Sequence, residues 1–155
     1  MTPRQRHLLR EATVRMLRKA KADRRRRNTQ ALECWLNDHA DILGITLPQF
    51  ETDGRPSRMD AETSLAFLAA TARVIERMVA QTVTPKPSLI EKHVAALGQA
   101  LKLNALETRI LTVAVNVATI PQLHSLAEII GNMPTDDEVD FTALHILANT
   151  DARQL

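Results

Sequence analysis

The chain has 155 residues, enough for one domain or two very small ones, and 45% of them are apolar, so it can bury a core. Aromatic residues make up only 3%, which leaves Leu, Ile, Val, Ala and Met, all compatible with helices, to build that core. The single Cys34 excludes an internal disulfide, and the longest apolar run, residues 110–120, is too short for a membrane span, so we expect a cytoplasmic protein without a secretory signal.

The net charge of +2 conceals a strong segregation along the chain. Residues 1–30 carry eleven Lys/Arg and two acids, whereas the remaining 125 residues carry nine Lys/Arg and sixteen acids. This pattern indicates a basic arm on an acidic body. Such asymmetry favours binding to RNA, DNA, an anionic membrane face or an acidic protein surface, and charge alone does not choose among them.

The basic arm is predicted to be helical over residues 1–43. Its first apolar residues recur every three or four positions, which lines them along one side of a helix with the arginines on the other. They are Leu8, Leu9, Ala12, Met16, Leu17 and Ala20. After the basic tract 24–27, a second stripe runs from Leu32 through Trp35 to Leu43 and can end at Gly44. The two stripes fit one long helix, or two helices with a joint near Asn28.

Residues 44–59 contain two prolines and a further glycine with little periodicity, so they are predicted to form a linker or loop. Residues 60–155 are predicted to form a helical body. Its first helix is capped by Asp60 and stops before Pro85. Two capping boxes follow, and they pair Ser88 with Glu91 and Asn104 with Glu107.

The later helices of the body are indicated by the same local signals. Pro121 suits a first helical turn, and Gly131 stands where that helix can end. Thr135 and Glu138 cap a last helix that carries Phe141, Leu144 and Leu147. Since no segment alternates convincingly between apolar and polar residues, we expect an all-α fold of five to seven helices in a compact domain.

Part of the body carries a family resemblance. Residues 101–115 (LKLNALETRILTVAV), 120–131 (IPQLHSLAEIIG) and 141–147 (FTALHIL) resemble the N-terminal helical, winged-helix-like region of certain bacterial AAA-type ATPases. The match spans residues 101–147, about a third of the chain. The resemblance implies a winged-helix-like C-terminal half that binds protein partners or clients, beside an ATPase module in the same polypeptide and in a homo-oligomer. ATP binding would belong to that module, because no Gly-x-x-x-x-Gly-Lys-Ser/Thr motif occurs in these 155 residues.

The same segments also fit a helix-turn-helix, with residues 110–117 as the supporting helix and 135–147 in the major groove. A groove helix should offer basic or amide side chains to bases and phosphates, but this one begins with Asp136, Asp137 and Glu138. Residues 123–130 fit little better, because Glu128 would face the same ligand. These acids are better explained as favourable charges near helix N-termini.

Three interpretations of the arm remain open. Its basic residues could neutralise phosphates, and the candidates for anion or nucleic-acid contact are Arg15, Arg18, Lys19, Arg24, Arg25, Arg26 and Arg27. No aromatic residue within residues 1–30 offers a platform for base stacking. Alternatively, the apolar stripe packs on the body and the arginines face acids of this chain or of a neighbouring subunit. Membrane-surface binding or targeting is a further alternative.

No residue pattern predicts catalysis, a metal site or a cofactor. The five histidines are scattered and are expected at surface or half-buried helix positions, without a His-Glu-x-x-His motif. Cys34 is expected to be a small core residue. The carboxylates at 136–138 lack the ligand spacing and the turn glycine of a calcium loop.

These patterns favour a non-catalytic docking or regulatory domain. The expected partner is another protein or an ATPase module of the same polypeptide, and the alternative is a nucleic-acid-binding regulator that uses the arm. A groove between residues 88–117 and 135–147 is the expected binding place, with Leu97, Leu101, Ile110 and Leu144 as its core. The candidate partner surface comprises Glu107, Glu128, Asp136, Asp137 and Glu138.

Overall fold

The fold is all-α. The computed structural model describes residues 1–23, 26–48, 61–131 and 146–148, and it describes side chains for 1–20, 29–48, 62–129 and 146–148. The helices in this part of the chain are α1 (Pro3–Asp23), α2 (Arg26–Leu43), α3 (Ala61–Gln81), α4 (Leu89–Ala100), α5 (Ala105–Thr119) and α6 (Pro121–Gly131). Residues 146–148 are also helical. The prediction of an all-helical chain is confirmed for the described residues.

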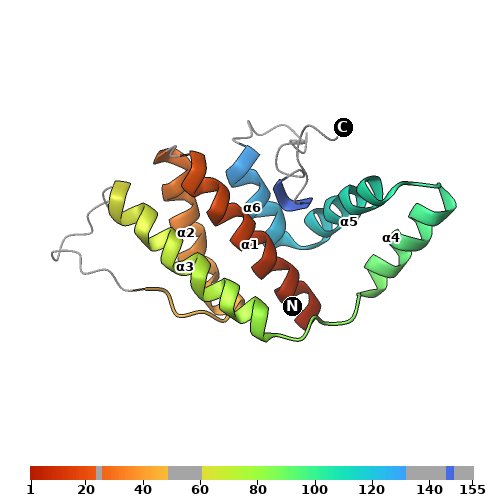
Figure 1. Ribbon diagram of the computed structural model, residues 1–155, viewed down its shortest axis with the longest axis horizontal. Helices are drawn as coiled ribbons and strands as arrows, with labels where there is room; N and C mark the ends of the chain where they lie inside the picture. The colour runs from red at the N-terminus through yellow and green to blue at the C-terminus, as the bar shows by residue number, and fades with distance from the viewer. Residues whose placement is uncertain (24–25, 49–60, 132–145, 149–155) are drawn as a thin grey trace.

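Helix α1 lies in the middle of a bundle and packs against α2, α3 and α6 (Figure 1). Its apolar stripe faces inward, and Leu9 and Leu17 are almost completely buried. The core is completed by the apolar faces of the three neighbouring helices, including Leu36 of α2, Leu68 of α3 and Leu126 of α6. The basic arm therefore supplies core positions, as one of its three interpretations expected. The division into arm, linker and body stays a prediction.

The arm forms two helices, one of the two arrangements that its apolar stripes fit. Helix α1 ends at Asp23 and α2 begins at Arg26. Helix α2 ends at Gly44, as predicted. The Gly44 φ of 67° is left-handed, and the N–H groups of Gly44 and Ile45 donate to the carbonyls of Asp41 and Ala40.

Two expectations about single residues in the bundle are wrong. Cys34 is exposed, because the core-facing positions of its turn are taken by Trp35 and Leu36. His7 is buried rather than half-buried, since it lies on the side of α1 that the rest of the chain covers. Trp35 behaves as a core residue, and its indole N–H donates to Ser125 Oγ at 2.9 Å, which joins α2 to α6.

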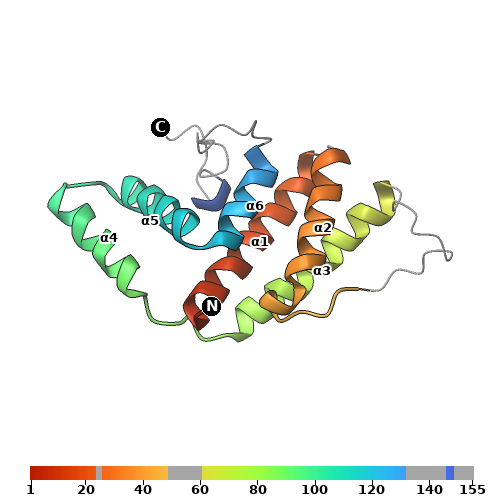
Figure 2. The same cartoon turned by 180° about the vertical axis from the view of Figure 1, so that it is seen from behind.

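Helices α4 and α5 form a hairpin that projects from the bundle at the end away from α2 and α3, as Figure 2 shows from behind. Helix α4 packs along α5, and α5 packs on α6. Pro121 opens α6 as predicted, directly after Ile120, whose backbone is extended. Within the described residues, no single helix is long and apolar enough to cross a membrane. Helices α5 and α6 reach that length and composition only together, and they are bent by 107°.

Candidate functional site

Two of the three candidate anion-binding residues of α1 contact other parts of this chain. Arg15 Nη1 donates to the Leu147 carbonyl at 2.6 Å, and Arg18 Nε donates to Glu76 Oε1 at 2.8 Å. Lys19 is exposed. The side chains of Arg24, Arg25, Arg26 and Arg27 lie outside the described residues. Arg15 and Arg18 thus face acceptors within the chain, as expected if the arm packs on the body.

The candidate acidic surface is not gathered into one patch in the part that the structure describes. Glu107 lies in the first turn of α5 and Glu128 near the end of α6, so they occupy opposite ends of this bent helix pair. Glu107 Oε2 accepts the Asn104 N–H at 2.7 Å, and Glu128 lies 3.5 Å from His124. Asp136, Asp137 and Glu138 lie outside the described residues. The expected groove also lies partly outside the described residues, because only residues 146 and 147 of its second wall are described.

The expected core of that groove is wrong in two positions. Leu97 is 48% exposed and Leu101 is 59% exposed, and Ile90 in the same row is 38% exposed. Ile110 is half-buried, and Leu144 lies outside the described residues. The physical reason is that α4 has α5 as its only helical neighbour among the described helices, and one neighbour covers only one side of a helix.

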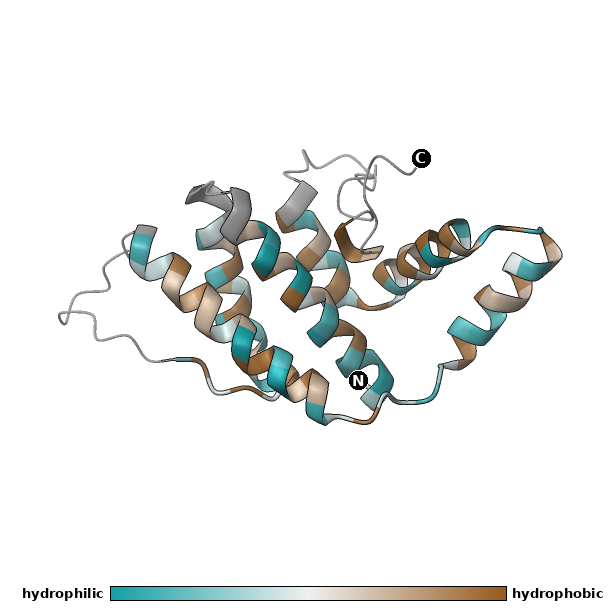
Figure 3. Ribbon diagram, in the orientation of Figure 1, coloured by the Kyte–Doolittle hydropathy of each residue, from teal (hydrophilic) through white to brown (hydrophobic). Residues whose placement is uncertain are grey.

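The exposed side of α4 is largely apolar. Two adjacent rows at helical spacing form it, with Ile90, Val94, Leu97 and Leu101 in one and Leu89, His93, Ala96 and Ala100 in the other. Val94 alone is buried. We call the seven exposed residues of these rows the α4 face. Figure 3 shows hydrophobic and hydrophilic segments alternating along α4, the pattern of an amphipathic helix. The sequence feature that could have predicted this exposed face is the second row. Two adjacent rows are together wider than the strip of helix surface that one neighbouring helix can cover.

Close packing at one point fixes α4 against α5. A Cβ atom added to Gly98 would lie 3.0 Å from Thr108 Oγ1 and 3.2 Å from Thr108 Cγ2. Such distances are too short for an ordinary van der Waals contact, so the absence of a side chain at 98 sets the helix separation. Thr108 is itself held, because its hydroxyl donates to the Asn104 carbonyl at 2.9 Å.

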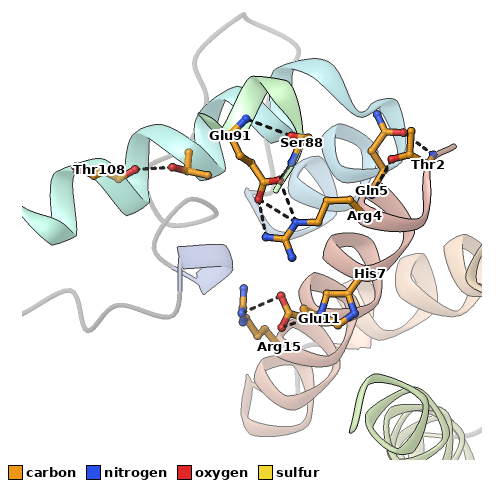
Figure 4. Close-up of polar contacts among 10 residues, drawn as sticks. Thr2, Arg4, Gln5, His7, Glu11, Arg15, Ser88, Glu91 and Thr108 are labelled. Atoms are coloured by element: carbon orange, nitrogen blue, oxygen red, sulfur yellow. Dashed lines mark hydrogen bonds and ion pairs between the residues drawn. The ribbon is translucent and has the colours of Figure 1, made fainter. Parts of the chain in front are cut away.

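The start of α4 is anchored to the start of α1. Arg4 Nη2 donates to Glu91 Oε1 at 2.6 Å, and Arg4 Nε lies 3.0 Å from Glu91 Oε2 (Figure 4). Glu91 also belongs to the predicted capping box, which is confirmed: its Oε2 accepts the Ser88 N–H at 2.8 Å, while Ser88 Oγ accepts the Glu91 N–H. One carboxylate therefore caps α4 and ties it to the bundle.

The charges in this anchor stabilise one another. Burial raises the pKa of Glu91, but hydrogen bonds from Arg4 and Ser88 outweigh this effect and leave the pKa below its ordinary value. The hydrogen bond to Glu91 raises the pKa of Arg4. Both groups are thus charged at neutral pH, and their charges cancel locally.

The end of α4 is closed by a Schellman motif. Lys102 has a φ of 56°, its N–H donates to the Gln99 carbonyl, and the Leu103 N–H donates to the Gly98 carbonyl at 2.8 Å. The second predicted capping box, Asn104 with Glu107, then starts α5. Helix α4 is therefore fixed at both ends although most of its surface is exposed.

Other parts of the described structure offer less for chemistry. An open pocket of about 550 Å³ lies where the start of α1 meets the start of α6 and the end of α2, and Arg6, Asp41 and Gln122 are among its lining residues. Within the described residues, no group of three His, Cys, Asp or Glu side chains could hold a metal ion.

No family model, curated protein or solved structure matches this chain. What the chain does is therefore inferred from its own surface.

Proposed function

We propose that this chain is a non-catalytic docking domain that holds a protein partner on the α4 face. The observation that carries the proposal is the exposure of Leu97 and Leu101 on a helix whose far side is fixed to the protein. Burying such aliphatic surface releases roughly 25 cal/mol per Å², so a partner that covers it gains binding energy directly. Exposed apolar patches on a folded protein mark interaction sites for this reason.

The fixed position of α4 supports the same function. Arg4 holds its first turn through Glu91, and Gly98 sets its distance from α5. A helix held in this way loses little conformational freedom when a partner binds. The entropic cost of ordering the surface is therefore small, and more of the contact free energy appears as affinity.

The resemblance of residues 101–147 to the N-terminal region of bacterial AAA-type ATPases extends the proposal. The domain would hold a partner or client in the cytoplasm while an ATPase module in a homo-oligomer acts on it. The reading frame beyond codon 155 tests this extension. We expect a Gly-x-x-x-x-Gly-Lys-Ser/Thr loop to follow, and a frame that stops would leave docking without a motor.

The docking function is tested by site-specific photo-crosslinking in cells. A photo-reactive benzoyl-phenylalanine at position 97 should give a discrete protein adduct, and the Leu101→Asp change should remove it. Position 83 provides the matched control, because Val83 is 90% exposed but precedes α4. Adducts that form equally from positions 83 and 97, or that survive Leu101→Asp, would contradict the proposal.

The alternative, a nucleic-acid-binding regulator, is separated by a salt series. Phosphate binding by the arm should weaken steeply as salt rises and should fall when residues 24–27 are replaced by Gln. We expect no binding of duplex DNA or RNA at physiological salt, because Arg15 and Arg18 already face acceptors within the chain. Tight, salt-sensitive binding that depends on residues 24–27 would favour the alternative.

A further inference from the structure

The spacing along the α4 face matches a helical partner. Ile90, Leu97 and Leu101 follow one another at intervals of seven and four residues, while Val94 of the same row is buried. These intervals keep three exposed aliphatic side chains on one side of the helix, from the first turn of α4 to the residue that directly follows it. The adjacent row carries Ala96 and Ala100, whose small side chains let a second helix approach closely.

The charges around the α4 face are basic. Lys92 borders it on the side away from α5, and Lys86 and Lys102 lie just beyond its two ends; all three are exposed. The one acid within α4 is Glu91, whose charge is offset by Arg4. Over residues 86–109 the sequence holds four Lys/Arg and two Glu. A helix lying along this face therefore gains from acidic side chains next to its apolar stripe.

From this combination we infer that the occupant of the α4 face is an amphipathic helix of a partner protein, with acidic residues bordering its apolar stripe. The inference rests on the proposed docking function and adds the chemistry of the partner. The partner helix would lie along Ala96 and Ala100, place its apolar stripe on Leu97 and Leu101, and bring its acidic border to Lys92.

A second copy of this chain fits the face less well. Two α4 helices that paired would bring the same three lysines together, and α4 has no free carboxylate to set against them. Like charges brought together at an interface oppose association. The charge pattern thus favours a different protein over self-association.

The test uses two synthetic helical peptides of about 20 residues, long enough to hold a helix. Both carry the same leucine stripe, and they differ only in bordering residues that are Glu in one peptide and Lys in the other. We expect the Glu peptide to bind at least about tenfold more tightly at low salt, with a difference that shrinks as salt rises. Isothermal titration calorimetry on the whole chain gives both affinities.

Three variants make the test specific. Leu97→Asp should abolish binding of the Glu peptide, whereas Val83→Asp, at a still more exposed aliphatic position outside α4, should leave it unchanged. The double change Lys86→Glu and Lys92→Glu should invert the preference, so that the Lys peptide binds more tightly. Circular dichroism of each variant should match the parent, because all four positions are exposed.

The outcomes separate this inference from the docking function. Equal binding of both peptides, still lost with Leu97→Asp, would overturn the acidic-helix inference and leave docking standing. Binding of neither peptide would also overturn the inference, while crosslinking from position 97 would still decide docking. Self-association in light scattering that Leu97→Asp abolishes would replace the partner helix with a second copy and overturn the inference.

Discussion

Arg4 and Arg18 of α1 each form an ion pair with a glutamate far along the chain, but the two ion pairs differ in burial. The Arg4 and Glu91 side chains are 19% and 9% exposed, whereas those of Arg18 and Glu76 are 69% and 35% exposed. Water and salt screen the second pair, so it should add little stability. Loss of Arg4 would instead leave a nearly buried carboxylate without its strongest partner, which is costly.

We therefore expect Arg4→Met to lower the free energy of unfolding by roughly 2 kcal/mol and Arg18→Met by less than about 0.5 kcal/mol. Urea denaturation at pH 7 measures both values. Because the pKa of Glu91 is depressed in the folded protein, its contribution is complete above its ordinary value of 4.5 and is lost as pH falls through the lower folded value. The effect of Arg4→Met should therefore shrink in acid. A constant effect down to pH 3, or equal losses for the two arginines, would contradict this account.

At the scale of elements, the α4–α5 hairpin depends on the missing side chain at Gly98. A glycine inside a helix costs roughly 1 kcal/mol relative to alanine, so this position carries an intrinsic penalty. The approach to Thr108 explains why the penalty is tolerated, since a Cβ there would push the helices apart. The left-handed Lys102 adds a second strained position in the same hairpin, at the turn that ends α4.

A double-mutant cycle between positions 98 and 108 tests this packing. We expect Gly98→Ala to stabilise the protein by about 1 kcal/mol when Thr108 is already Ala, because only the gain in helix propensity remains. With Thr108 present, the same change should give no gain or a loss, so the two positions should be coupled by about 1 kcal/mol. Hydrogen exchange of the α4 amides locates the effect. Equal effects of Gly98→Ala in both backgrounds would show that Thr108 does not limit the approach.

On the scale of the whole molecule, stability and surface chemistry lie in different places. The bundle around α1 buries large aliphatic side chains, whereas α4 exposes them. Leu9 and Leu97 are the same residue type in two helices, one completely buried and the other about half exposed. They therefore allow the roles of core and surface to be compared directly.

We expect Leu9→Ala to cost about 3 kcal/mol of unfolding free energy and Leu97→Ala to stay within about 0.5 kcal/mol of the parent. Thermal and urea denaturation give both numbers. The loss at Leu9 reflects the cavity left in the core, which the neighbouring helices cannot fill. A loss at Leu97 comparable with that at Leu9 would mean that α4 packs into the core, and the docking face would then be wrong.

Local features were the most predictable from the sequence. The capping boxes at Ser88 and Asn104, the end of α2 at Gly44 and the start of α6 at Pro121 all depend on a few neighbouring residues, and all are confirmed. Placement relative to other helices was less predictable. The row containing Leu97 and Leu101 has the spacing of a core stripe, and only the number of neighbours around α4 decides whether it is covered.

The candidate site was also less predictable wherever it depends on contacts between distant segments of the chain. The contact between Arg4 and Glu91 joins residues that are 87 positions apart, and no local pattern in the sequence predicts it. The acidic residues at 136–138 were singled out by composition, and they lie outside the described residues. Charge segregation did indicate that the arginines of α1 could face partners within the chain, because the acids they need lie beyond residue 30.

The central position of α1 has a consequence for the order in which the protein is made. Helix α1 is synthesised before the other described helices, and one of its core neighbours, α6, begins only at residue 121. At the usual 5–20 residues per second, roughly 5–20 s of translation separate the two. During that interval the apolar stripe of a basic helix emerges from the ribosome before its final neighbour exists. Co-translational chaperones should therefore meet α1 before the other helices that the structure describes.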